Sequence, residues 1–365
     1  MTFKPLNEND TVNTRTLLHE AIPLTGAIVS GTYGTNNIKT YSHGMFESVY
    51  DYPYLSSSAN HIFDLTAGIP TNSSLYNLAA SQQVSKKRNI YNQMAQVLMG
   101  YDATGSIQQF DEDGDLLAIG VKLKEVFVMP FSRLLVKDEI KKETFELQLD
   151  TGAYVAATQT FAANKRITIT DLSASTEYRV NSPAGDYGIL YATASSPNQI
   201  LDAGAGGRTA TFNGNKYWYA GLLFYQAGIA VLTGSIFGSQ LTTPATFRPG
   251  VTNVNALLTG STIDQISNAF RHRMYNLQFN NTTELNSTVY FCRVNHNEFN
   301  YSSNPTYLEN SRIRIKTQAT DEPLAYITTV GLYNDNNELL ATAKLSEPLK
   351  KSASNEFTIR TRLDY

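Results

Sequence analysis

The stretch DEDGD at residues 111–115 is the densest group of metal-ligand side chains in the chain. Carboxylates at alternate positions are the ligands that calcium prefers in loop sites. An EF-hand loop starting at Asp111 would need glycine at its sixth position and glutamate at its twelfth, but Leu116 and Lys122 stand there. We therefore predict a solvated turn, with Gly114 in the left-handed conformation, and no metal site. Cation binding stays open as the alternative for the three aspartates Asp111, Asp113 and Asp115.

No other pattern in the sequence indicates catalysis or a bound cofactor. The glycine run from Gly204 to Gly207 lacks the spacing of a dinucleotide-binding loop and opens no helix, so we interpret it as a loop. Nucleophile elbows, HExxH helices and phosphate-binding loops are absent as well. We expect neither an enzyme nor a cofactor. The alternative is a glycosidase, whose paired acids leave no local motif. The five histidines do not have the sequence spacing of a helical or zinc-type metal-binding pair. They are His19, His43, His61, His272 and His296.

Composition favours a protein that binds other proteins through an uncharged polar surface. Charged residues are 17% of the chain, below the usual quarter, and Asn, Thr, Ser and 22 tyrosines take their place. Antibody binding loops use a similar set of residues, because it provides contact area and hydrogen bonds with little desolvation of charge. Strands also favour Tyr and Thr, so a β-rich fold without a special surface fits this composition equally well.

Charge and hydropathy exclude several other classes of partner. With a net charge of -3 and no block of Lys or Arg, the chain lacks the basic surface that binds nucleic acid. Its single cysteine, Cys292, excludes an internal disulfide framework. The sequence contains no run of about 18 apolar residues and no signal-peptide pattern, so we expect no membrane association and synthesis in the cytosol.

Periodicity predicts a mainly β protein of the α+β class, with antiparallel sheets in β-sandwich-like subdomains and a few short helices. One helix is expected between Ser81 as N-cap and Gly100 as the residue that ends it. A second is expected after an N-cap at Ser261, with its buried face formed by Ile263, Ile266, Phe270 and Met274. Strands are predicted at residues 121–131, 144–149, 165–170, 187–192, 217–232, 289–294 and 312–316.

Composition changes near Asp150 and again near Gly260. The segment between them is poor in charge and rich in Gly, Ala, Ser and Thr. We therefore predict three domains: an N-terminal α+β domain at 1–150, a β-rich insertion at 151–260 and a C-terminal domain at 261–365. No repeat of fixed period is present, which argues against a propeller or a solenoid.

The last forty residues predict a β-meander that serves as a docking module. Two strands flank the turn at 334–337, and a third follows Pro348. In this third strand one face is apolar, formed by Phe357, Ile359, Leu363 and Tyr365, and the other is polar. Such patterning indicates pairing with the chain's own sheet or with a neighbouring subunit. Protection of an edge strand by charge is the alternative reading of the polar face. The predicted contacts with a neighbour are Arg360, Arg362, Asp364 and Tyr365.

A second candidate interface is the tyrosine-rich segment GMFESVYDYPYL at residues 44–55. Aromatic residues are enriched in permanent interfaces, and we select Tyr50, Tyr52 and Tyr54 as contact residues. An ordinary core segment is the alternative, because it would have the same composition.

Several segments resemble virion structural proteins of large contractile-tailed bacteriophages, especially those that infect cyanobacteria. In the N-terminal part these are LLHEAIPLTGAIVSGTYG, IKTYSHGMFESVYDYPYLSSSANHIFDLTAG, RNIYNQMAQVLMGYDATGSIQQFDEDGDL and FSRLLVKDEIKK, and GLLFYQAGIAVLTGSIF follows near residue 225. The ending YITTVGLYNDNNELLATAKLSEPLKK…RTRLDY resembles the C-terminal module of baseplate-wedge and related tail proteins.

This resemblance implies a non-enzymatic structural subunit of the virion, best suited to the wedge region of a tail baseplate. The partners it implies are other virion proteins and copies of the chain itself, and the location is the virion after synthesis in the bacterial cytoplasm. A neck or head-to-tail connector and a fibre-attachment or host-recognition protein are the alternatives. The resemblance carries over no catalytic, cofactor or metal residue.

Overall fold

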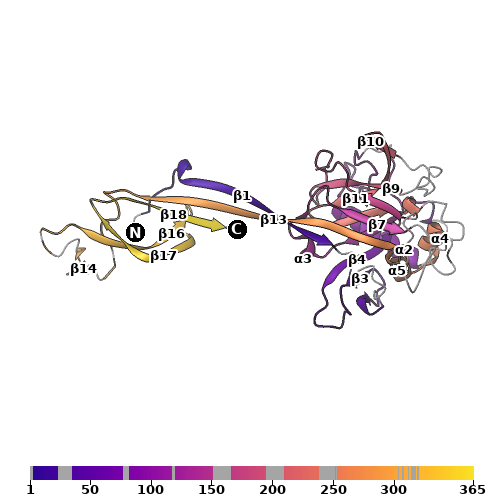
Figure 1. The fold of residues 1–365 in the computed structure, drawn as a ribbon, viewed down its shortest axis with the longest axis horizontal. Coiled ribbons are helices and arrows are strands. Elements are labelled where there is room, and N and C mark those ends of the chain that lie inside the picture. The colour runs from indigo at the N-terminus through magenta and orange to yellow at the C-terminus, as the bar shows by residue number, and fades with distance from the viewer. Residues whose placement is uncertain are drawn as a thin grey trace. The chain divides into compact units, whose positions relative to one another are not determined.

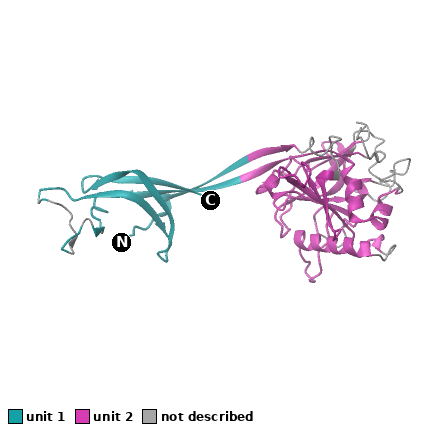
Figure 2. Ribbon diagram, turned by 90° about the horizontal axis from the view of Figure 1, so that it is seen from below, with its two compact units in different colours: residues 1–18, 284–365 teal, residues 19–283 magenta. Residues whose placement is uncertain are grey.

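The computed structural model describes residues 3–23, 35–76, 82–116, 120–150, 166–194, 209–237, 251, 253–302, 304–305, 308–310, 312–313, 318 and 320–365. The chain divides into two compact units (Figure 2). Unit 1 combines Met1–Leu18 with Glu284–Tyr365, and unit 2 is His19–Thr283.

The structure is mainly β, as the sequence predicts. The first strands are β1 (Thr11–Pro23), β2 (Ile38–Thr40), β3 (Glu47–Tyr50), β4 (His61–Gly68), β5 (Val126–Pro130), β6 (Glu139–Ile140), β7 (Glu146–Asp150), β8 (Arg166–Thr170) and β9 (Tyr187–Ala194). They are followed by β10 (Thr209–Phe212), β11 (Asn215–Phe224), β12 (Ile229–Thr233), β13 (Met274–Val294), β14 (Leu308–Glu309), β15 (Arg312–Ile313), β16 (Leu324–Tyr333), β17 (Leu339–Ser352) and β18 (Phe357–Asp364).

Helices are few and short. They are α2 (Gln82–Leu98), α3 (Arg133–Val136), α4 (Val254–Gly260) and α5 (Ile263–Arg271), with 3-10 turns at Glu8–Asp10, Thr35–Asn37 and Gly234–Phe237. Among the described residues, no helix has the length and apolar character needed to cross a bilayer.

One large sheet organises unit 2. Its neighbouring strands are β13, β7, β8, β9, β11, β12, β5, β4, β3 and β2, in that order. Figure 1 labels several of them, among them β13, β7, β9 and β11. The pairs along this path are antiparallel. The expected single strand at 217–232 is two strands, because a turn ending at Gly228, with φ of +66°, reverses the chain between β11 and β12.

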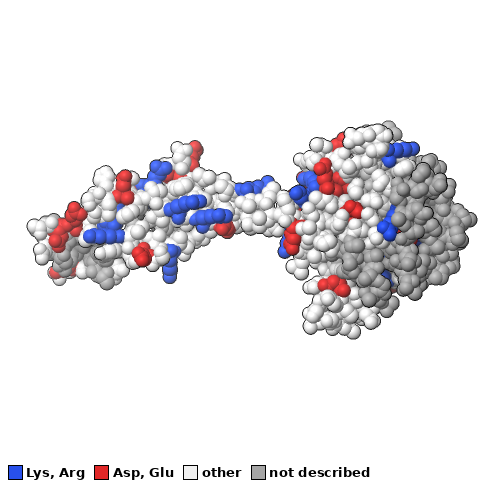
Figure 3. Space-filling view, viewed as in Figure 1, with Lys and Arg blue, Asp and Glu red and all other residues white. Residues whose placement is uncertain are grey.

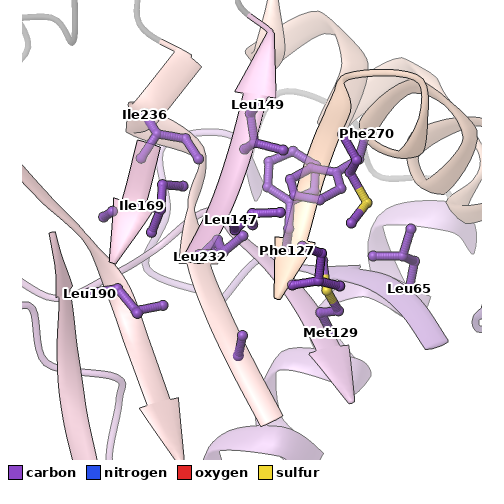
Figure 4. Packing of buried hydrophobic residues seen from close by; sticks show 14 of the residues in the cluster. Leu65, Phe127, Met129, Leu147, Leu149, Ile169, Leu190, Leu232, Ile236 and Phe270 are labelled. Carbon is purple, nitrogen blue, oxygen red and sulfur yellow. The ribbon is translucent and has the colours of Figure 1, made fainter. Parts of the chain in front are cut away.

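Both faces of this sheet are covered by apolar side chains. On β5, Phe127 and Met129 belong to one buried cluster, whereas Val126 and Val128 belong to another. Since successive side chains of a strand point to opposite faces, the two clusters lie on opposite sides of the sheet. Figure 4 shows part of the first cluster, in which Phe127 lies beside Phe270, their ring centroids 5.0 Å apart. Unit 2 therefore has the two-sided core that explains its long apolar runs.

Helix α2 packs closely on β4. Gly68 makes this possible, because a Cβ atom there would lie only 2.9 Å from Cβ of Tyr91. The helix ends as predicted before Gly100, which has φ of +78°. The predicted N-cap, Ser81, lies outside the described residues, as does the loop from Gly204 to Gly207.

The second predicted helix is α5, with two corrections. Its N-cap is Thr262, whose hydroxyl accepts a hydrogen bond from the Gln265 backbone in a capping box. Ser261 instead ends α4, a helix that the sequence analysis missed. Met274 is the first residue of β13 rather than part of the helix. α5 ends at Arg271, and the Arg273 N–H donates a hydrogen bond to the Phe270 carbonyl, so the chain turns before the strand begins.

The three C-terminal strands exist, but they do not form one sheet. β16 and β17 pair as a hairpin, closed by a turn in which Asn337 has φ of +62° and Asn334 accepts a hydrogen bond from the Glu338 N–H. β18 pairs instead with the Ser287–Val294 part of β13.

The two units divide the chain differently from the three predicted segments. Residues 151–260 lie within unit 2, and the N-terminal residues belong with the C-terminal ones because β1 pairs with β13. Composition changes along a sequence do not reveal such distant strand pairing.

Candidate functional site

The predicted docking strand β18 has the expected two faces. Phe357 and Leu363 are half-buried and Ile359 is 9% exposed, whereas the alternate residues from Thr358 to Asp364 are exposed. Tyr365, which we predicted as a contact with a neighbour, is 69% exposed, and that contact stays a prediction. Its backbone pairs with Asn286, and its hydroxyl lies 3.1 Å from the Thr288 hydroxyl.

Two of the predicted contact residues are already paired within unit 1. The Arg362 guanidinium donates to the Asp364 carboxylate at 2.6 Å and to the Ser287 hydroxyl at 2.9 Å. The Ser287 hydroxyl also donates to Asp364, and these contacts lower the pKa of that carboxyl, the hydrogen bond from Ser287 first. Arg360 lies on the same exposed face, opposite Phe291 of β13. The charged face of β18 thus stabilises the pairing of β18 with β13, in addition to any contact that it makes with a neighbouring molecule.

The tyrosine segment at residues 44–55 contains β3, which is largely buried, and ends in the exposed start of the loop between β3 and β4. Asp51 holds the base of this loop, because its carboxylate accepts hydrogen bonds from the backbone and side-chain amides of Asn60 at 2.6 and 2.8 Å. Tyr52 and Tyr54 are 59% and 37% exposed, and Tyr50 is half-buried at the end of β3. The structure therefore places two of the three tyrosines on the surface of unit 2, outside both hydrophobic clusters.

Unit 1 exposes much more apolar surface than unit 2 in proportion to its length. Of the 23 large apolar side chains exposed in the described residues, 14 belong to it, although it is the shorter unit. Both hydrophobic clusters lie in unit 2. Among the described residues of unit 1, the buried apolar side chains are Val289, Val294, Ala325 and Ile359. Because apolar burial is the main favourable term in folding, a single copy of unit 1 has little core to hold its strands.

β1 shows this feature within one element. None of its 13 residues is buried, and Val12, Leu17 and Leu18 are 45%, 46% and 52% exposed. Among the described strands β1 pairs with β13 alone, so its outer edge presents unpaired backbone groups.

The β16–β17 hairpin has an apolar face that the chain covers only in part. Val330 is opposite Ala343 and Leu332 is opposite Ala341, and all four side chains are half-buried. At its turn end, Leu339 and Leu340 are 53% and 67% exposed. The sequence analysis found these strands but did not select them as an interface, because alternation does not tell which molecule covers the apolar face.

The three aspartates of residues 111–115 come together, with one carboxylate oxygen from each within 4.8 Å of the others. Asp111 is fully buried, and its carboxylate accepts hydrogen bonds from the Lys122 ammonium and, at 3.2 Å, from the Asp113 N–H. Burial raises the pKa of Asp111, and the side chain of Asp113 adds to this effect. Gly114 has the expected positive φ, +70°, but the prediction of a solvated turn was wrong, because Asp111 and Glu112 are buried. Lys122 occupies the position at which an EF-hand has glutamate. Its ammonium group therefore places a positive charge beside the buried carboxylate of Asp111.

The histidines are not gathered into a site in the described residues. The Asp111 group is the cluster of ligand side chains found there, and it contains no histidine. His61 contacts Asp64 at 2.8 Å, and His272 contacts the Asn268 carbonyl at 2.7 Å, so each has a local structural partner.

Comparison of the chain with protein-family models, with curated proteins and with solved structures gave no match.

Proposed function

We propose that this chain is a non-enzymatic structural subunit of a tailed-phage virion, located in the wedge region of the tail baseplate. Its partners in this role are other virion proteins and copies of itself. The sequence segments that resemble virion proteins support the proposed location. The exposed apolar surface of unit 1 supports a role in assembly.

The single observation that carries an assembly role is the distribution of apolar side chains in unit 1. Among the described residues of unit 1, 14 large apolar side chains are exposed and four apolar side chains are buried, as in a core that is shared between molecules. Permanent interfaces have this character, whereas transient ones are about as polar as the rest of the surface.

The proposed location can be tested by labelling intact particles with gold-tagged antibody and imaging them by electron microscopy. Gold at the distal end of the tail is the expected result. Gold at the head-to-tail junction would move the protein to the neck, and gold along fibres would assign it to host recognition. Absence of the protein from a blot of denatured particles would remove the virion role altogether.

The exposed tyrosine loop provides a second test. We expect Tyr50→Ser, Tyr52→Ser and Tyr54→Ser together to abolish incorporation into particles while the isolated chain stays folded, because aromatic side chains at an interface contribute most of its energy. Tyr101→Ser is the matched control, since Tyr101 is 56% exposed outside this loop. Circular dichroism of the purified variants separates the two roles: loss of the fold would show that the loop is an ordinary core segment.

A further inference from the structure

The exposed face of β18 carries a group of arginines. Arg360 and Arg362 are two positions apart on this strand, so their side chains lie on one face. Arg293 of β13 is opposite Thr358 of β18, and directly opposite residues of an antiparallel pair share a face. The side chains of Arg293 and Arg362 are 56% and 52% exposed, and Arg360 is exposed as well. We call this set the arginine face: Arg293, Arg360 and Arg362.

One guanidinium of the arginine face has no acid beside it. Arg293 pairs with Asp10 at 2.7 Å, and Arg362 pairs with Asp364 at 2.6 Å. Arg360 forms no ion pair within the described part of the chain. Three arginines against two aspartates leave a charge of +1 on this face. Figure 3 shows side chains of both signs on the visible face of unit 1, so this positive charge is local to the arginine face.

Unit 2 exposes an open carboxylate oxygen on β4. Oδ1 of Asp64 accepts a hydrogen bond from the Ser48 hydroxyl at 2.5 Å and lies 2.8 Å from Nε2 of His61. Nε2 is the donor there, because an ionised carboxylate can only accept. These two contacts fix the position of the carboxylate. Oδ2 has no hydrogen-bond partner among the described residues, and the Asp64 side chain is 26% exposed.

Aromatic rings continue this surface of unit 2 towards the tyrosine segment. The His61 ring contacts the Tyr50 ring, with centroids 5.5 Å apart, and Tyr50 contacts Tyr54 at 6.4 Å. Tyr54 is 37% exposed, and Tyr50 and His61 are half-buried. A fixed carboxylate and two tyrosine rings are thus linked through one histidine. We call this group the tyrosine–aspartate surface: Tyr50, Tyr54, His61 and Asp64.

The charges at the tyrosine–aspartate surface are opposite in sign to those of the arginine face. Asp51 follows Tyr50 and holds the base of the loop through Asn60. Lys39 is the basic residue in the row that the strand pairing aligns with Asp64. With histidine neutral, two aspartates against one lysine leave a charge of -1. Complementary charge at two surfaces favours their encounter and fixes how they align.

We infer that the arginine face of one copy docks on the tyrosine–aspartate surface of a second copy, with Arg360 contacting Asp64 and the tyrosine rings. This deepens the proposed function and rests on its premise that the chain contacts copies of itself. A guanidinium suits the site, because its planar donors pair with a carboxylate and its face stacks on aromatic rings. The two surfaces differ, so the contact is heterologous, and its repetition forms a ring or a chain of subunits.

Sedimentation velocity and light scattering of the purified full-length chain, over a range of concentrations, test this contact. The wild-type chain should associate beyond its monomer mass of 40.4 kDa. Arg360→Glu and Asp64→Arg should each raise the dissociation constant at least about tenfold, because like charges then meet. The matched controls reverse a charge at exposed positions outside both surfaces and should leave association unchanged: Lys344→Glu in unit 1 and Glu177→Lys in unit 2. Circular dichroism shows whether each variant is folded. Asp64→Asn retains an oxygen for Ser48 and His61 and should weaken association less, so it replaces Asp64→Arg if that variant does not fold.

Mixing the two reversed chains is the second test. Arg360→Glu chains mixed with Asp64→Arg chains should associate as the wild type does, because every contact between unlike chains again joins opposite charges. A wild-type chain that stays monomeric, association insensitive to both reversals, or a mixture that does not recover would overturn the inference. The outcomes remain distinct from those of the proposed function. Association of a chain that is absent from particles would refute only the virion role, and a monomer present in particles would refute only this contact.

Discussion

At the scale of single residues, the buried acid Glu47 of unit 2 should make the stability of the fold depend on pH. Its side chain is fully buried on β3, 3.8 Å from the Arg271 guanidinium, and neither carboxylate oxygen accepts a hydrogen bond in the described residues. Burial raises the pKa of Glu47 from 4.5 to about 7, Arg271 opposes this shift, and Asp264 adds to it. Burial without hydrogen bonds penalises the charged form, which is why the protonated form is favoured.

The pH dependence follows from the direction of this shift. Because the pKa is higher in the folded state, the contribution of Glu47 to stability is complete below about pH 4.5 and is lost as the pH rises to about 7. The loss is at most about 3 kcal/mol. We expect Glu47→Gln to reduce the difference in unfolding free energy between pH 5 and pH 7.5, as measured by urea unfolding. Glu177→Gln, at an exposed position, is the control that should leave the difference unchanged. An equal pH dependence of wild type and Glu47→Gln would contradict the prediction.

At the scale of elements, the contact between α2 and β4 depends on the absence of a side chain at Gly68. An added Cβ would approach both the side chain and the backbone of Tyr91, at 2.9 to 3.1 Å. The Ile69 N–H also donates to the Lys87 carbonyl at 3.3 Å, so backbone hydrogen bonding joins the strand end to the helix. Tyr91 in turn donates to the Leu123 carbonyl at 2.7 Å. The helix therefore has little freedom to move away.

We expect Gly68→Ala to lower the free energy of unfolding by about 1–3 kcal/mol, because overpacking forces the helix from its position. Gly260→Ala is the matched control: Gly260 ends α4, and an added Cβ meets nothing within 4 Å. It should be neutral or slightly stabilising. Thermal and urea unfolding of both variants measure the difference, and equal stabilities would show that α2 accommodates the methyl group.

At the scale of the whole molecule, the two units differ in how much of a core each contains. Since both hydrophobic clusters lie in unit 2, we expect a fragment of residues 19–283 to fold alone as a monomer. Residues 1–18 joined to 284–365 by a flexible linker should fold only as an oligomer. Circular dichroism and sedimentation of the two fragments check this expectation, and a stable monomeric fold of the second fragment would contradict it.

The sequence by itself determined the mainly β class and some of the elements, although it missed α4 and merged β11 with β12. Alternation identified β18 and the hairpin strands, asparagines identified the turn at 334–337, and a glycine marked the end of α2. These are local signals, because side-chain period and left-handed backbone preferences act within a few residues. They also predicted the mainly β class of the fold.

Tertiary structure alone decided which strands pair and which apolar faces stay open. β18 pairs with β13 rather than with β17, and β1 joins residues 261 to 275 positions away in the chain. The sequence pattern of β16 and β17 resembles that of any half-buried sheet, yet the structure leaves their apolar face half-covered while burying β4 and β5. Local periodicity specifies that a face is apolar, but only the arrangement of distant elements specifies what covers it.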